Sequence, residues 1–119
     1  MRNNNIVTLF SILPQIKILH FQTANYIEHE ILGELYEDFD GKIDELIEIM
    51  LQHTNFPVGT KLTTEVMYWT SKADTIGYLQ KLQKTLEDME LTVATDEGNK
   101  LQEMVSSIKR SLYLLAKNP

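Results

Sequence analysis

Potential metal ligands follow one side of the segment 26–52. The row consists of His29, Gly33, Tyr36, Asp40, Asp44 and Glu48, at steps of three or four residues. On an α-helix these steps keep side chains roughly on one side. Imidazole and carboxylate groups together suit iron or manganese, and zinc is also possible. Asp44 and Glu48 are one helical turn apart, so the two carboxylates could hold the same ion.

His29 cannot share an ion with Glu48 inside one chain. Nineteen residues separate them, which is about 28 Å along a helix, whereas a metal ion needs its ligands at about 2 Å. Two copies of the helix, packed antiparallel about a two-fold axis near Glu37, would place His29 of one copy beside Asp44 and Glu48 of the other. Such an interface is self-complementary, so we expect a homodimer through this helix with two equal sites.

Apolar residues at helical spacing predict the elements that carry this row. The predicted helices cover approximately residues 5–21, 26–52, 73–91 and 97–116. Pro14 predicts a kink in the first helix or a helix start nearby, and Asn25 with Glu28 has the spacing of a capping box before the second. A long crossover follows, with a short helix from Thr64 to Trp69. Short links at both ends and a long middle crossover predict an all-α, ferritin-like four-helix bundle, a single domain over residues 1–119.

Each of the four predicted helices has an apolar stripe that is expected to face the core of this bundle. The stripe of the first helix comprises Ile6, Phe10, Leu13, Ile16 and Leu19. The stripe of the second comprises Ile27, Ile31, Leu35, Phe39, Ile43, Leu46 and Met50.

Composition narrows the functional classes. The formal net charge is −6, which repels nucleic acid, so DNA binding is not expected. The chain has no cysteine, which excludes thiolate ligands and fits a reducing compartment such as the cytoplasm. No apolar run is long enough to span a membrane. Any metal must therefore be held by histidine, carboxylate or water.

The segment LHFQTANYIEHEILGELYEDFDGKIDELIE, residues 19–48, contains two histidines and two acids at characteristic spacings. The residues concerned are His20 beside Phe21, His29 before Glu30, Asp44 fifteen residues after His29, and Glu48 four residues later. In this pattern, and in Leu35, Tyr36 and Phe39 between them, the segment resembles the ferroxidase segment of the miniferritins, the DNA-protecting proteins of starved cells. The last predicted helix is also similar to that family's final helix.

The resemblance implies which residues bind metal and what the metal does. It assigns the ligands His20, His29, Asp44 and Glu48, which in the miniferritins bridge two subunits. It further implies iron as the metal, a dimer or larger homo-oligomer, and ferroxidase activity in which oxygen or peroxide accepts electrons from Fe²⁺. A protein of this kind would sequester iron and limit oxidative damage in the cytoplasm of a bacterial or phage-infected cell.

Several features differ from the miniferritins. His20 and His29 are only nine residues apart, which is a shorter gap than the family's, and Gly33 stands where the family often has a further acid. The chain is also short and lacks basic tails. A second hypothesis is therefore a catalytically silent ferritin-like bundle that acts as a structural or protein-interaction module. Oxygen uptake in the presence of Fe²⁺ would separate the two.

Overall fold

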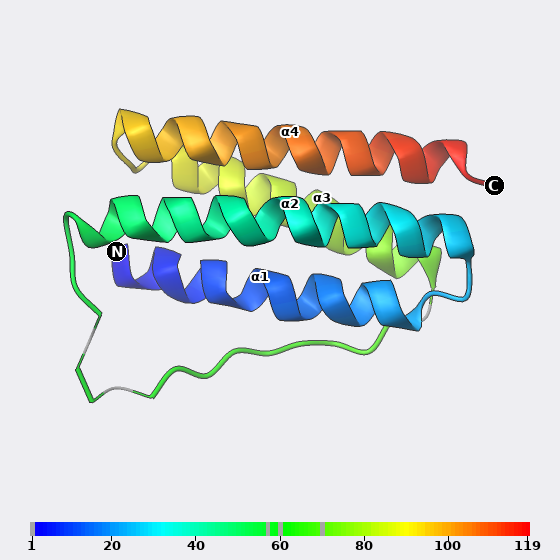
Figure 1. Cartoon of the computed structure of the whole chain (residues 1–119), viewed down its shortest axis with the longest axis horizontal. Coiled ribbons are helices and arrows are strands. Elements are labelled where there is room, and N and C mark those ends of the chain that lie inside the picture. The colour runs from blue at the N-terminus through cyan, green and yellow to red at the C-terminus, as the bar shows by residue number, and fades with distance from the viewer. Residues whose placement is uncertain (1, 57, 60, 70) are drawn as a thin grey trace.

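Four helices account for most of the chain (Figure 1). The computed structural model describes residues 2–56, 58–59, 61–69 and 71–119. Its helices are α1 (Arg2–Gln22), α2 (Tyr26–Leu51), α3 (Lys72–Glu90) and α4 (Thr95–Lys117). Within these described ranges no strand is present, and no helix is long and apolar enough to cross a membrane. The predicted all-α, four-helix arrangement is thus confirmed.

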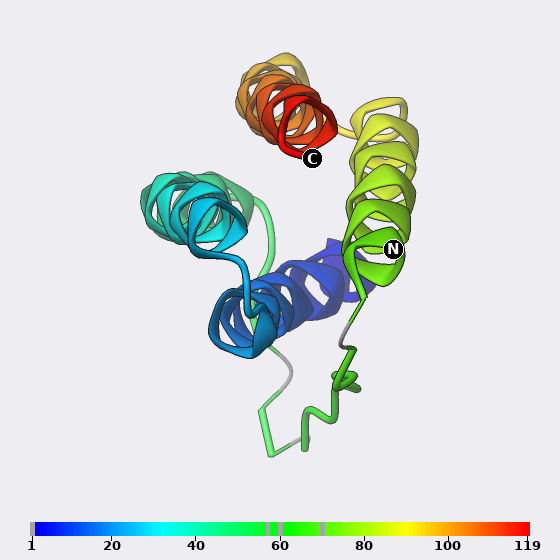
Figure 2. The same ribbon diagram turned by 90° about the vertical axis from the view of Figure 1, so that its right-hand side faces the viewer.

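The helices form two antiparallel hairpins that a long crossover joins. α1 and α2 make the first hairpin and α3 and α4 the second, and the crossover returns along the bundle so that α2 and α3 run in the same direction (Figure 1). The closest helix pairs are α1–α2, α2–α4 and α3–α4, while α1 and α3 approach each other less closely (Figure 2). One cluster of buried side chains contains residues from all four helices, and Phe39 of α2 lies fully inside it.

One residue of the apolar stripe predicted for α1 is exposed instead of buried. Phe10 is 42% exposed, whereas Leu9 and Ile12 are fully buried. α1 also continues through Pro14, so the predicted helix start near this residue is absent. Pro14 is exposed, and water can therefore satisfy the carbonyl that lacks an amide partner. Because α1 is apolar nearly all round, spacing alone could not identify its buried side.

α2 begins as the sequence predicts, with part of the expected cap. The Asn25 side chain accepts a hydrogen bond from the backbone amide of Glu28 at 3.0 Å. The Asn25 amide donates to the hydroxyl of Thr23 at 3.2 Å, a role the prediction gave to Glu28. Ile27 in this first turn is 54% exposed rather than buried. The remaining residues of the predicted α2 stripe are buried.

The short helix predicted from Thr64 to Trp69 is wrong, because this part of the crossover is irregular. The reason lies in α1, where Gln15 is only 3% exposed. Its side chain accepts a hydrogen bond from the Met67 amide at 2.8 Å and donates one to the Met67 carbonyl at 2.9 Å. Both backbone groups of Met67 are therefore satisfied without a helix, and an isolated turn is costly to nucleate.

Candidate metal centre

The turn between α1 and α2 brings the two candidate histidines into direct contact. His20 lies in the last turn of α1 and His29 in the first turn of α2. Their ring centroids are 3.8 Å apart and the ring planes differ by 19°. The Nδ1 atom of His20 is 2.7 Å from the carbonyl oxygen of His29, and Nδ1 of His29 is 2.8 Å from the carbonyl oxygen of His20. The nine-residue gap thus produces a stacked, reciprocally bonded pair.

These two hydrogen bonds fix where each imidazole proton resides. A carbonyl oxygen only accepts, so both Nδ1 atoms must donate. In the neutral rings both Nε2 atoms then keep their lone pairs. A metal-binding histidine commonly uses one nitrogen for the ion and the other to donate to a carbonyl or carboxylate. Each imidazole is therefore in the tautomer that leaves its Nε2 atom available to a metal ion.

Gly33 provides the space that the His20 ring occupies. A Cβ atom at position 33 would lie 2.9 Å from Cε1 of His20 and 3.2 Å from its Nδ1. The ring cannot easily move aside, because its Nδ1 bond and its stacking on His29 hold it. An acid at this position would displace His20. Gly33 thus allows the close histidine pair, a role that the sequence pattern did not reveal.

We expect alanine to have different effects at two glycines of α2. Gly41 is exposed and a Cβ at this position would meet only open space, so Gly41→Ala should stabilise the metal-free protein by about 1 kcal/mol through helix propensity. In Gly33→Ala the same gain is opposed by about 1–3 kcal/mol of overpacking against His20. Urea unfolding gives both values, and NMR shifts of the His20 ring should change only in Gly33→Ala. Equal stabilisation by the two substitutions would contradict this role of Gly33.

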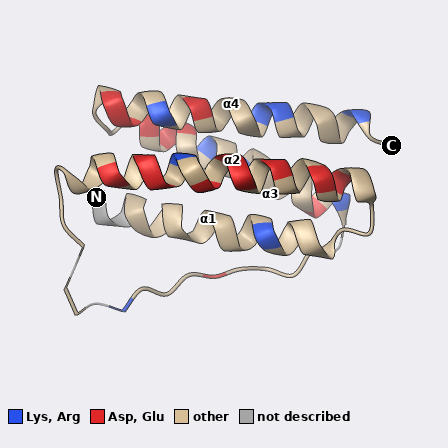
Figure 3. Ribbon diagram, viewed as in Figure 1, with Lys and Arg blue, Asp and Glu red and all other residues tan. Residues whose placement is uncertain are grey.

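The two acidic candidates lie elsewhere on the same helix. Asp44 and Glu48 are exposed and lie farther along α2, a helix on which acidic residues recur along most of its length (Figure 3). Along α2 the distance from His29 to Asp44 is about 22 Å. Within the described part of the chain, no three histidine, aspartate or glutamate side chains are grouped closely enough to hold an ion. One copy of the chain therefore assembles the histidines but does not bring the carboxylates to them.

Comparison with known proteins places the chain in a family. A model of a family of unknown function, DUF5856, matches residues 20–115. The chain belongs to the DUF5856 family. The matched region begins at His20 and includes all four candidate ligands. No curated protein and no solved structure matches the chain.

Lys17 is a further charged group beside the histidine pair of this DUF5856 chain. Its ammonium lies 4.4 Å from the ring centroid of Tyr36 and 5.2 Å from that of Phe21. Phe21 in turn contacts the His20 ring, with the two centroids 5.2 Å apart. The sequence patterns gave Lys17 no role. Its position three residues before His20, one helical turn away, is the signal that could have identified it.

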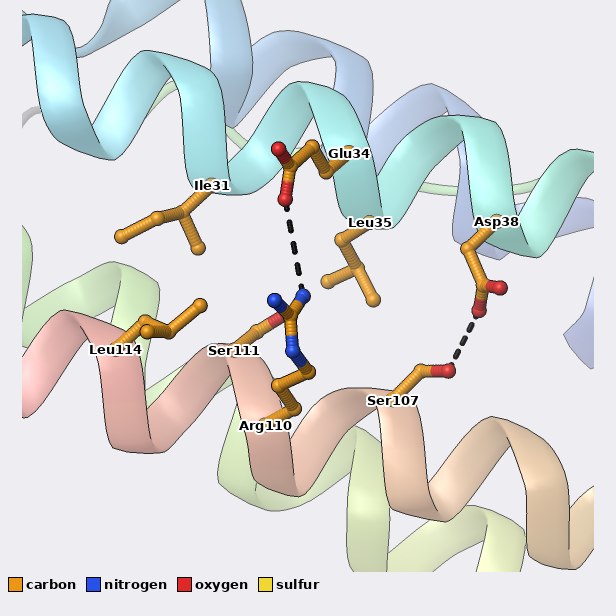
Figure 4. A pocket seen from close by; sticks show the side chains of 8 residues that line it. All are labelled: Ile31, Glu34, Leu35, Asp38, Ser107, Arg110, Ser111 and Leu114. Carbon is orange, nitrogen blue, oxygen red and sulfur yellow. Dashed lines mark hydrogen bonds and ion pairs between the residues drawn. The ribbon is translucent and has the colours of Figure 1, made fainter.

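The other side of α2 is occupied by contacts with α4. Asp38 accepts a hydrogen bond from the Ser107 hydroxyl at 2.6 Å and pairs with Lys42. Arg110 lies 3.7 Å from Glu34, across a small pocket of about 170 Å³ between the two helices (Figure 4). These acids are engaged within the subunit, so Asp44 and Glu48 on the outer side remain better placed to meet another molecule.

The pairing of Asp38 predicts an acid-sensitive contribution to stability. Partial desolvation raises the pKa of Asp38, but hydrogen bonds from Lys42 and Ser107 outweigh it and hold the pKa below its ordinary value. A carboxyl whose pKa is lowered by folding stabilises the fold above its unfolded pKa, and this is lost as the pH falls through the folded pKa. Asp38→Asn should therefore be less stable than wild type at pH 7, and urea unfolding should show the difference shrinking below about pH 4.

Proposed function

We propose that two copies of this chain share a metal site, which binds Fe²⁺ as the protein's substrate. His20 and His29 of one copy would meet Asp44 and Glu48 of the other, giving a miniferritin-like protein that sequesters or oxidises iron. The observation that carries the proposal is the stacked histidine pair, in which both Nδ1 atoms are held by backbone carbonyls. Two imidazoles with two carboxylates form a donor set that suits Fe²⁺, and also Zn²⁺ or Mn²⁺.

The exposed side of α1 supports the same two-fold arrangement. Its outer stripe comprises Val7, Phe10, Pro14, Lys17 and Phe21, which are all exposed. These residues recur every three or four positions, so they follow a single seam with Pro14 at its centre. A second copy of α1 laid antiparallel on this seam would place Phe21 opposite Val7 of the other copy. Most of this apolar surface would then be buried.

The centre of this seam coincides with the axis required by the candidate ligands. His20 stacks on His29, which fixes the register of the hairpin. Six residues back from His20 is Pro14 and six residues forward from His29 is Leu35, so these two lie at about the same level. The axis that brings His29 to Asp44 and Glu48 passes near Glu37, close to that level. In the proposed dimer, one two-fold operation would therefore serve both helices.

Charge makes this association dependent on a cation. The outer row of α2 includes the exposed carboxylates of Glu30, Glu37, Asp44 and Glu48. Two such rows facing each other repel until a cation or protons intervene. We therefore expect a metal-free chain that associates weakly and a metal-loaded chain that forms a dimer or a larger homo-oligomer. Its proposed setting is the reducing cytoplasm of a bacterial or phage-infected cell.

Metal content and mass in solution test the proposal together. Anaerobic calorimetric titration with Fe²⁺ should give saturable binding, and sedimentation should show a rise in mass over the same range of metal. Absence of heat in the wild type, or a monomer at saturation, would overturn the shared site. Oxygen uptake then separates turnover from storage. Fe²⁺ that binds without oxygen uptake would favour the alternative, a catalytically silent bundle with a structural or interaction role.

A further inference from the structure

A second candidate site lies on the opposite side of α1 from the histidine pair. α1 and α3 approach each other less closely than the other neighbouring helices do, and the crossover runs along this opening (Figures 1 and 2). The result is a groove of about 490 Å³ between α1, α3 and the crossover. This volume lies in the range of sites that bind small molecules.

The walls of this groove combine aromatic and small residues with polar side chains. Trp69 of the crossover and Tyr78 of α3 both line it, with their ring centroids 5.8 Å apart at a tilt of 46°. Ala73 and Gly77, one turn apart on α3, provide a surface without bulky side chains, and a Cβ at Gly77 would meet no atom within 4 Å. Gln15 holds the crossover wall in place through Met67.

Two polar groups in the groove have no partner among the residues that the structure describes. Neither the Tyr78 hydroxyl nor the Lys81 ammonium makes a hydrogen bond or ion pair with any of these residues. Burial raises the pKa of Tyr78 well above its ordinary value, so the hydroxyl remains a hydrogen-bond donor. The carboxylates of Glu65 and Asp74 also line the groove. Charges of both signs therefore line the groove, which disfavours a strongly charged ligand.

We propose that this groove binds an uncharged planar aromatic molecule, with its ring against Trp69 and Tyr78 and a carbonyl oxygen accepting a hydrogen bond from the Tyr78 hydroxyl. The surface of Ala73 and Gly77 leaves room for a flat ring, which a larger side chain at either position would fill. The site is independent of the histidine pair and needs neither metal nor a second copy of the chain.

Trp69 is the only tryptophan of the chain, so its fluorescence reports on this groove directly. Metal-free protein is titrated with menadione, an uncharged quinone with two carbonyl oxygens. The chain has no cysteine, so the quinone has no thiol to which it could add. We expect saturable static quenching of Trp69. Linear quenching equal to that of free N-acetyltryptophanamide would overturn the proposal.

Three variants locate the bound quinone. Gly77→Leu fills the groove and should weaken binding at least about tenfold. Gly41→Leu is the matched control on α2, where a Cβ also meets open space, and should leave binding unchanged. Tyr78→Phe keeps the ring and should weaken binding about fivefold, as expected for one neutral hydrogen bond. Circular dichroism checks that each variant is folded. Equal affinity in wild type and Tyr78→Phe, together with undiminished binding in Gly77→Leu, would contradict the site.

Discussion

Two variants that each lose one half of the proposed metal site should restore it when they are mixed. The first carries His20→Ala with His29→Ala, and the second carries Asp44→Ala with Glu48→Ala. Each homodimer would have two incomplete sites, so Fe²⁺ binding should be abolished in both. A mixed dimer combines the intact histidines of the second variant with the intact carboxylates of the first. It therefore regains one complete site, which a site within a single chain could not do.

The fraction of Fe²⁺ binding that returns depends on how the two variants pair with each other. Random pairing should give about one quarter of the wild-type sites, and up to about one half if the metal selects the mixed dimer. Anaerobic calorimetry on the mixture measures this fraction, and sedimentation measures the mass. A mixture that binds no more Fe²⁺ than the two variants do separately would contradict a shared site.

A charge-matched control distinguishes ligation from the general acidity of α2. Glu34→Ala with Glu45→Ala removes the same charge as the carboxylate variant, but from the side of α2 that faces α4. There Glu34 lies near Arg110 and Glu45 pairs with Lys100. This control should keep Fe²⁺ binding near the wild-type value. Equal losses in the control and in the Asp44 and Glu48 variant would mean that bulk charge, rather than ligation, attracts the ion.

Replacing Gln15 by leucine should release the crossover from α1. Leucine fills much of the same volume, but both hydrogen bonds to Met67 disappear. Two such bonds contribute about 2 kcal/mol together, and we expect the free energy of unfolding in urea to fall by about that amount. Amide exchange at Met67 should accelerate strongly, because its protected hydrogen bond would be lost.

Gln80→Leu provides the control for that substitution. Gln80 is exposed on α3, so its replacement removes a glutamine without touching the crossover. Stability and Met67 exchange should both stay close to wild type in this variant. Unchanged Met67 exchange in Gln15→Leu would show that other contacts, such as Trp69 against Tyr78, hold the crossover by themselves.

Features that depend on local sequence could be predicted well. The four helices follow from apolar spacing, and the cap at Asn25 follows from side chains within three residues of each other. Gln15, by contrast, appeared only as a polar interruption in an apolar helix. Its partner Met67 is 52 residues away, and no local sequence pattern predicts such a contact. The absence of a helix from Thr64 to Trp69 could not be predicted for the same reason.

The candidate site could be predicted only in part. Resemblance drew attention to His20 and His29, but their stacking depends on the path of the turn that Thr23 and Asn25 stabilise. Gly33 looked like a missing acid, because the ring that occupies its space comes from another helix. The distance from the histidines to Asp44 followed from helix geometry alone. The shared site itself involves a second chain and stays a prediction.

The reciprocal bonds between His20 and His29 join this candidate ligand pair to the backbone that supports it. Each ring anchors the main chain of the other's helix, so this end of the hairpin cannot fray without separating the two imidazoles. In the proposed site, occupancy by a cation and local opening of the hairpin would then be mutually exclusive. By mass action, every gain in free metal should lower the rate at which proteases cut between the two helices. The protease sensitivity of this turn would therefore indicate how much of the site is occupied by metal.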